Sequence, residues 1–284
     1  MSRTVRRLLP GRREDMDDLV TRRPQHRMET FNPFLFINHH GPQVFPPGNR
    51  GLPFGPHPHR GFETVTFIVE GSLTHRDSEG HESTMTRGGV QWMTAGRGVE
   101  HSETSPREFR DHGGALDILQ LWLNLPSRLK MSEPRYIGLQ REQIPSVAID
   151  RATVHVISGS FEGERRPVEP LTDVELMTVE LRAGGRITLP APRDHVVFLY
   201  AVRGDNQFDL IEFNDDGDTI ELDAARDSLL IFGHATPLRE PIAAYGPFVM
   251  NTQEEILQTI RDYQAGRFGG AADVSARARR QPPR

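Results

Sequence analysis

The sequence predicts an all-β protein built from two similar antiparallel β-barrel domains, and three observations support this prediction. The 284 residues include 26 glycines and 22 prolines spread along the chain, as expected for many short strands joined by tight turns. Short runs with strand-like composition recur, whereas helical periodicity is scarce. Two of the runs also resemble each other, which indicates an internal duplication in a chain long enough for two cores.

The expected strands are apolar runs separated by turn signals such as Ser78-Glu79-Gly80 and Asp215-Asp216-Gly217. This pattern is typical of antiparallel sandwiches and barrels. The runs cover residues 64–69, 89–93, 116–123, 152–157, 176–181, 196–202, 208–213 and 228–232.

The duplication is read from "ETVTFIVEG" (63–71) and "DHVVFLYAVRG" (194–204), each an apolar strand that closes on glycine. Each is followed by a polar hairpin and a further strand, "GGVQWM" or "DSLLIF". Two prolines interrupt regular structure between the copies, in residues 125–136. We therefore expect an N-terminal barrel over residues 1–134, a C-terminal barrel with a terminal helix over 135–268, and a disordered tail over 269–284.

One helix is expected, in "NTQEEILQTIRDYQAGRFG". Thr252 can cap its start while Glu255 reaches back to form a capping box. Ile256, Ile260 and Tyr263 share one face, and a glycine supplies the stop. An apolar stripe of this kind has to pack on something, and we expect it to pack on the flank of a barrel.

Composition excludes several classes of function. The chain has no cysteine, which rules out disulfides, thiolate nucleophiles and cysteine-ligated metals and fits a cytoplasmic location. Its net charge of -5 argues against direct nucleic-acid binding. No run approaches the roughly 20 apolar residues that a membrane helix needs, and the arginine-rich first 27 residues lack the apolar core of a secretory signal. We expect those residues to belong to the fold.

Two pairs of polar residues at strand ends predict a metal site. His57 and His59 flank a proline before the first apolar run, and His101 and Glu103 follow Gly96 and Gly98 in "QWMTAGRGVEHSE". Both pairs are spaced i, i+2, which places both side chains on one face of a strand. If the two strand ends lie side by side, three imidazoles and one carboxylate converge.

The ligand types narrow the choice of metal. Imidazole suits iron, zinc, copper and nickel, and a carboxylate without a thiolate favours a divalent ion of the non-haem Fe(II) kind. Four protein ligands would leave two positions of an octahedron open for chemistry. A closed structural zinc would use the four ligands tetrahedrally. Both geometries remain open at this point.

The other histidines fit the metal pattern less well. His39 and His40 are adjacent, so on a strand they face opposite ways, and we expect structural roles for them. His195 and His234 have no i+2 partner, which predicts a second barrel without a metal.

The segments "HPHRGFETVTFIVEG", "GGVQWMTAGRGVEHSE", "LWLNLPSRLKMSEPRY" and "NPFLFINHHGP" closely resemble pirins, members of the cupin superfamily, and the similarity runs from about residue 30 to residue 268. The resemblance implies a bicupin of two jelly-roll barrels that face each other, with a metal, usually iron, in the N-terminal barrel. It also implies His57, His59, His101 and Glu103 as ligands.

This sequence differs from the pirin pattern at one place and leaves a second ambiguous. It reads Asn38-His39-His40 where pirins tend to have an acidic pair, so the rim of the pocket is expected to differ in charge. Glu63 lies where many other cupins place a glutamate ligand, four residues after His59. The pirin pattern favours Glu103 as ligand, which gives Glu63 an outer or structural role.

Several bacterial pirin-like proteins are similar in activity to quercetin 2,3-dioxygenases, so the resemblance implies a flavonol or related phenol and O2 as substrates. Fe(II) is the expected ion, with Ni, Mn, Cu, Co and Zn as alternatives. Glu103 or Glu63 could accept the proton of the flavonol hydroxyl. Phe54, Trp92 and Met93 are candidates for an apolar wall, although each could equally be barrel core.

Two other functions stay open. Some pirins act as iron-dependent regulators that bind a transcription factor or a metabolic enzyme, which would give this chain a protein partner. The third option is a metal-binding cupin that acts on another small phenolic or oxidised compound. The fold and the metal site do not separate these roles, because function depends on the pocket and its access.

Overall fold

The computed structural model describes residues 1–269 and consists mostly of antiparallel strands, as the sequence predicts. The chain forms two compact units. Among the described residues, the first unit contains 15–21, 38–141 and 239–269, and the second contains 1–14, 22–37 and 142–238. Among residues 1–269, none of the helices has the length and apolar character that a bilayer-spanning segment needs.

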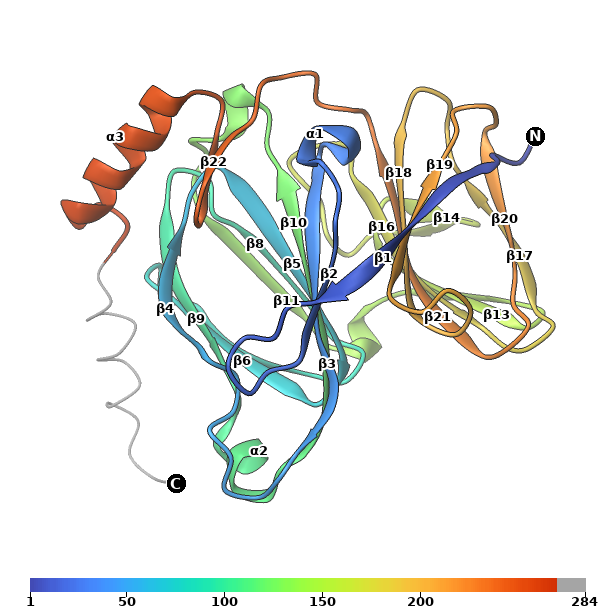
Figure 1. Cartoon of the computed structure of the whole chain (residues 1–284), viewed down its shortest axis with the longest axis horizontal. Helices are drawn as coiled ribbons and strands as arrows, with labels where there is room; N and C mark the ends of the chain where they lie inside the picture. Colours follow the sequence, from blue (N-terminus) through green and yellow to red (C-terminus); the bar gives the residue numbers. More distant parts are fainter. Residues whose placement is uncertain (270–284) are drawn as a thin grey trace. The chain divides into compact units, whose positions relative to one another are not determined.

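The first unit is built from two main sheets with strand orders β11-β8-β5-β10-β3 and β4-β9-β6-β7 (Figure 1). A core of large aliphatic and aromatic side chains packs on these strands and includes Ile68, Leu116 and Ile118. Its strands are β3 (Phe34–Phe45, which begins in the second unit), β4 (Phe54–His59), β5 (Phe62–Glu70), β6 (Ser72–Asp77), β7 (Glu82–Thr86), β8 (Val90–Thr94), β9 (Val99–Thr104), β10 (Gly114–Asn124), β11 (Arg135–Leu139), β22 (Ala243–Tyr245) and β23 (Phe248–Met250). Its helices are α2 (Arg107–His112), the 3-10 turn η1 (Ser127–Leu129) and α3 (Gln253–Gln264).

The second unit repeats this architecture with strand orders β2-β1-β19-β18-β21-β16-β13-β12 and β17-β20. Its core contains Val154, Met177, Leu199 and Phe232 among other buried apolar side chains. Its elements are β1 (Val5–Arg13), β2 (Thr21–Pro24), α1 (Met28–Phe31), β12 (Ser146–Ile149), β13 (Ala152–Ser158), β14 (Ser160–Phe161), β15 (Glu164–Arg165), β16 (Glu175–Leu181), β17 (Arg186–Pro190), β18 (Val196–Arg203), β19 (Asp209–Phe213), β20 (Thr219–Asp223) and β21 (Ser228–Ala235). The 3-10 turn η2 (Arg141–Gln143) lies where the chain passes between the units.

The strands expected from the sequence are confirmed, and so is the similarity between the two copies. The runs correspond to β5, β8, β10, β13, β16, β18, β19 and β21. In each unit the two duplicated strands pair antiparallel, β5 with β8 and β18 with β21. The repeat in the sequence is therefore a repeat in strand pairing.

The compact units differ from a single division of the chain at residue 134. Strand β1 pairs with β19, with Leu8 opposite Ile211, so the first residues belong to the fold but lie in the second unit. Helix α3 lies in the first unit, beside β22 and β23 (Figure 1). The apolar pattern of a terminal strand or helix shows that it packs, but not which of two similar barrels it packs on. The expected tail beyond residue 269 lies outside the described residues.

Helix α3 has the cap that the sequence predicts. The Thr252 hydroxyl accepts a hydrogen bond from the backbone N–H of Glu255, and the Glu255 side chain accepts one from the backbone of Thr252. Ile256 is buried in a cluster with Phe268, which follows the helix. Gly98 makes room for this segment, because a Cβ there would lie 2.8 Å from the Phe268 ring and the φ of +131° is one that glycine tolerates.

Candidate metal centre

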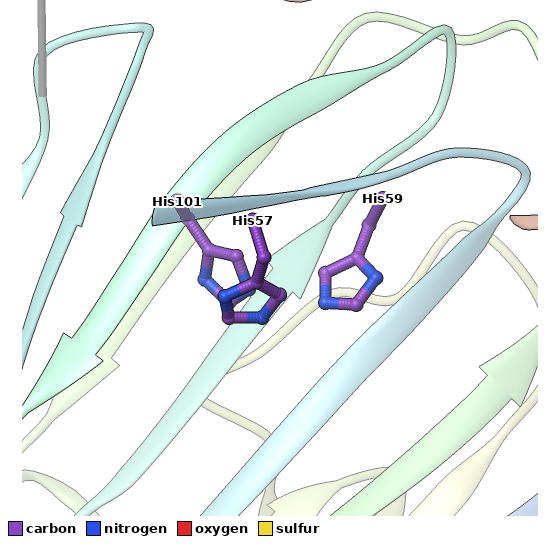
Figure 2. A group of neighbouring side chains, drawn as sticks. All are labelled: His57, His59 and His101. Atoms are coloured by element: carbon purple, nitrogen blue, oxygen red, sulfur yellow. The ribbon is translucent and has the colours of Figure 1, made fainter. Parts of the chain in front are cut away.

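Strands β4 and β9 bring the predicted histidines together. The strands pair antiparallel with His57 opposite His101 and Phe54 opposite Glu103. The side chains of His57, His59 and His101 point toward one another (Figure 2), and one ligand atom from each lies within 4.8 Å of the others. The i, i+2 spacing places His57 and His59 on one face of β4, and the pairing with β9 brings His101 to them, as the sequence pattern predicts.

The outer nitrogen of each ring has a partner that sets its orientation. His57 Nδ1 lies 2.8 Å from the Gly55 carbonyl oxygen, and His59 Nδ1 lies 3.3 Å from that of Pro247. His101 Nδ1 lies 3.4 Å from His75 Nδ1. Because a carbonyl oxygen can only accept, His57 and His59 donate from Nδ1, which leaves Nε2 as the nitrogen of each ring that can bind a metal.

Two of the inner nitrogens are buried and lack protein partners. Nε2 of His59 and Nε2 of His101 have no hydrogen-bond partner within the described part of the chain. Burial, followed by the charge of His57, lowers the pKa of His59 and of His101 well below the usual value. These two rings are therefore neutral at pH 7, the form that binds metal.

This donor set fits a divalent metal ion. A buried nitrogen without a hydrogen bond loses its hydration and gains nothing in return, which is costly unless something else engages it. Neutral imidazoles are good ligands for iron, nickel, copper and zinc. Three of them leave room in the coordination sphere for further ligands.

Glu103 lies on the same strand face as His101 but is engaged elsewhere. Gln91 Nε2 and Thr66 Oγ1 donate to its Oε1, the latter at 3.3 Å, and Gln120 Nε2 donates to its Oε2 at 2.6 Å. Its ligand atom groups with those of His75 and His101 within 4.8 Å, not with the complete three-histidine group. Glu103 is therefore adjacent to the site through His101, while two amide side chains hold its oxygens.

Glu63 is not brought to the histidines. Thr94 Oγ1 donates to its Oε1 at 2.6 Å, and burial raises the pKa of the Glu63 carboxyl. Thr66 on the same strand reaches Glu103, and residues an odd number of positions apart on a strand face opposite sides. Glu63 thus projects from the other face of β5.

The three predicted wall residues separate in the same way. The Gln91 side chain on β8 reaches Glu103. Met93, two residues later, shares the strand face of Gln91, and Trp92 projects from the opposite face. The Phe54 ring lies 5.0 Å from that of His40 and packs at the edge of the core.

The aromatic side chain beside the histidines is Trp122 on β10, which the sequence analysis missed. Its ring lies 5.2 Å from that of His59 and stacks on Phe62 at 4.1 Å. Gln120, two residues earlier, shares its face and bonds Glu103. The i, i+2 pair of glutamine and tryptophan inside an apolar strand was a usable signal of a functional face.

The two adjacent histidines of the first unit have other partners. His39 Nε2 lies 2.5 Å from Asp117 Oδ1, and His40 Nδ1 lies 2.9 Å from the Thr21 hydroxyl. Both rings are buried. Neither belongs to a metal-binding group among the described residues.

Comparisons with known protein families and sequences find relatives that cover most of this chain. The family model described as Pirin matches residues 15–123, and the one described as Pirin C-terminal cupin domain matches residues 176–269. A Pseudomonas aeruginosa protein named "putative quercetin 2,3-dioxygenase" is 40% identical over 249 residues, which cover 84% of this chain and 86% of that protein. Human pirin is 37% identical over 257 residues, 85% of this chain and 84% of that protein.

Solved structures show the same fold. The structure of quercetin 2,3-dioxygenase from Acinetobacter baumannii superposes with a TM-score of 0.88 at 32% identity, over 95% of this chain and 100% of that chain. A bacterial pirin from Escherichia coli in complex with nickel(II) has a TM-score of 0.62 at 22% identity, over 81% of this chain and 99% of that chain.

Proposed function

We propose that this chain, which belongs to the pirin family, is a metal-dependent dioxygenase that opens the central ring of a flavonol such as quercetin with O2 and releases carbon monoxide. The observation that carries the proposal is the group of three imidazoles beside the stacked rings of Phe62 and Trp122. The similarity to proteins named quercetin 2,3-dioxygenase supports it.

His57, His59 and His101 would hold one divalent ion, for which we propose Fe(II), with Ni, Mn, Cu, Co and Zn as alternatives. Glu103 is proposed as a fourth ligand. Its carboxylate would then exchange one of its amide donors, Gln91 or Gln120, for the ion. When bound, the ion would lower the pKa of the flavonol 3-hydroxyl and so supply an electron-rich anion for reaction with O2.

Glu103 is also the proposed acceptor of the hydroxyl proton. Of the two sequence candidates, Glu103 is the one whose ligand atom lies within 4.8 Å of that of His101, whereas Glu63 lies on the other face of β5. The amide side chains of Gln91 and Gln120 hold the carboxylate in place without neutralising it. A fixed acceptor beside the hydroxyl needs little reorganisation when the proton moves.

Thr64 and Trp122 are proposed to orient the substrate. The two residues are opposite each other in the β5–β10 pair, and the buried Thr64 Oγ1 has no hydrogen-bond partner among residues 1–269. A substrate oxygen could accept a hydrogen bond from the Thr64 hydroxyl while a flat substrate ring contacts the Trp122 indole. Of the predicted wall residues, Met93 and Phe54 are retained, and Trp92 is replaced by Trp122.

The test is oxygen uptake by protein loaded anaerobically with Fe(II) and then given quercetin in air-saturated buffer. His101→Ala is the matched inactive variant, and His234→Ala in the second unit is the control. We expect uptake and carbon monoxide release by the wild type and by His234→Ala, and neither by His101→Ala. Equal uptake by all three samples would contradict the proposal.

The same experiment separates the alternative function. Iron bound by the wild type without uptake above His101→Ala would favour an iron-dependent regulator, and the next step would be a search for a protein whose binding requires the metal. A phenolic substrate, O2 and a cytoplasmic location remain predictions from the sequence and the family.

A further inference from the structure

A second histidine lies directly behind the ligand His101. His75 is on β6, which pairs with β9 so that His75 is opposite Glu103 and Asp77 is opposite His101. Both imidazoles are fully buried, and their Nδ1 atoms are 3.4 Å apart. Two nitrogen lone pairs would repel each other at this distance, so a proton has to lie between them.

Asp77 determines which of the two imidazole rings carries that proton. Its Oδ2 lies 3.1 Å from His75 Nε2, and its Oδ1 accepts the backbone N–H of His81 at 2.9 Å. The His81 Nδ1 also lies 3.0 Å from Oδ2, so Asp77 faces one backbone N–H and two imidazole nitrogens. A carboxylate surrounded by donors can only accept, so His75 donates from Nε2, and in the neutral ring Nδ1 carries the lone pair.

His101 must then donate from Nδ1 to His75, which leaves the lone pair of His101 on Nε2. That atom is the one without a protein partner, and it belongs to the ring that faces His57 and His59. The direction of the hydrogen bonds therefore agrees with the geometry of the three-histidine group.

We propose that Asp77 and His75 form a hydrogen-bonded chain that fixes the tautomer of His101 and thereby sets the metal affinity of the site. The inference rests on the metal centre in the proposed function, and it makes His75 a positioning residue. Partners that hold the second nitrogen of a ligand imidazole typically contribute about 10- to 100-fold to metal affinity.

Tyr136 holds the plane of the His75 ring. The two rings stack at 4.1 Å with an interplanar angle of 12°. A phenylalanine at position 75 can keep this stacking while it removes both nitrogens. His75→Phe is therefore a sharper test than an alanine, which would also leave a cavity.

The first measurement is the dissociation constant for Co(II), titrated into the metal-free forms of the wild type, His75→Phe and His75→Gln. We expect binding to weaken about 10- to 100-fold in His75→Phe. His75→Gln should recover part of the loss, because its amide oxygen can accept from His101. The matched control is His195→Phe, which removes the histidine of a similar pair in the second unit and should leave the affinity unchanged.

The second measurement is the ¹⁵N NMR spectrum of the histidine rings in the metal-free protein. We expect the Nδ1–H tautomer for His101 in the wild type and growth of the Nε2–H tautomer in His75→Phe. A role for His75 in packing alone would not move this signal. The wild-type spectrum decides the hydrogen bond even if His75→Phe does not fold.

Three results would overturn the inference: unchanged Co(II) affinity in His75→Phe, an Nε2–H tautomer of His101 in the wild type, or two Co(II) per wild-type chain. A second Co(II) that is lost in His75→Phe would mean that His75, His101 and Glu103 hold an ion of their own. If the wild type binds no metal, the metal centre and the effect of His75 on it both fail, while an Nδ1–H tautomer would still establish the hydrogen-bonded chain.

Discussion

Each unit contains a pair of histidines whose Nδ1 atoms face each other, but the two pairs have different surroundings. His75 and His101 are 3.4 Å apart in the first unit, and His195 and His234 are 3.2 Å apart in the second. The first pair continues into His57 and His59 on β4. Among residues 1–269, the second pair is part of no group of three ligands.

The difference shows what turns a histidine pair into a candidate metal centre. In the second unit, Glu175 Oε2 lies 4.0 Å from His234 Nε2 but also accepts the backbone N–H of Ser160. In the first unit, an HxH strand adds two imidazoles whose outer nitrogens are already held by carbonyl oxygens. The candidate site therefore depends on the two imidazoles that converge from a neighbouring strand, more than on the histidine pair itself.

The largest expected effect is the loss of metal binding in His101→Ala. Removing one of the three histidine ligands should weaken binding by more than the about 100-fold that loss of an outer partner can cause. His234→Ala should bind as the wild type does. Elemental analysis after dialysis measures both, and circular dichroism checks the fold. Metal loss in His234→Ala would show that the second unit contributes to the site.

The second prediction concerns the acid sensitivity of the second unit. Burial, followed by the charge of His195, lowers the pKa of His234 to about 4. The unfolded chain binds this proton near pH 6.5, so the stability that neutral His234 provides is lost as the pH falls from 6.5 towards 4. The loss from this group is about 3 kcal/mol.

Urea unfolding of the metal-free protein at pH 7 and pH 4.5 tests this value. The fall in unfolding free energy should be smaller in His234→Leu than in the wild type by up to about 3 kcal/mol. The buried histidines of the first unit contribute equally to both proteins and cancel in the difference. Besides His195, the charges of Asp173 and Arg3 act on His234, and Glu175 lies 4.0 Å away. An equal fall in both proteins would exclude a neutral, buried His234.

The third prediction is that metal stabilises the protein through the first unit. At a free Co(II) concentration of 100 times the dissociation constant, the unfolding free energy should rise by about 2.7 kcal/mol. The increase should persist in His234→Ala and vanish in His101→Ala. The rise in the midpoint temperature of thermal unfolding on addition of Co(II) measures this stabilisation. Stabilisation that survives in His101→Ala would mean that the ion binds elsewhere.

How far the site could be predicted from sequence depends on the kind of interaction involved. The i, i+2 spacing of His57 and His59 fixes a shared strand face, so their convergence with His101 could be predicted. The strand faces of Glu63 and Trp92 could not be predicted, because a residue type near a motif does not show which face of a buried strand it occupies. Strand β5 is buried on both faces over most of its length, which removes the usual polar–apolar alternation.

The positions of the terminal elements could not be predicted for a different reason. The capping box of α3 is a local signal and was confirmed. Its placement in the first unit, like the pairing of β1 with β19, depends on contacts across more than 150 residues, which no local pattern encodes. The proposed role of His75 could not be predicted either, because it depends on Asp77 and His101 lying on paired strands.

The smallest predicted effect separates the ring of Tyr136 from its hydroxyl. The hydroxyl bonds Ser83 Oγ at 2.5 Å and donates to Gln91 Oε1 at 3.3 Å, while the ring stacks on His75. Tyr136→Phe should therefore cost about 1 kcal/mol of stability. The Co(II) affinity should change less than about twofold, because the phenyl ring still holds His75.

The alkaline limb of the stability curve gives an independent check. Burial raises the pKa of Tyr136 to about 12, so the folded protein retains this proton while the unfolded chain loses it near pH 10. Stability from this group is therefore complete below pH 10 and is lost as the pH rises to 12. Tyr136→Phe should lack that component of alkaline unfolding. If the variant instead loses Co(II) affinity as strongly as His75→Phe, the hydroxyl acts on the site through Gln91 and Glu103, and the orientation of the first unit's histidines depends on more than the Asp77–His75 chain.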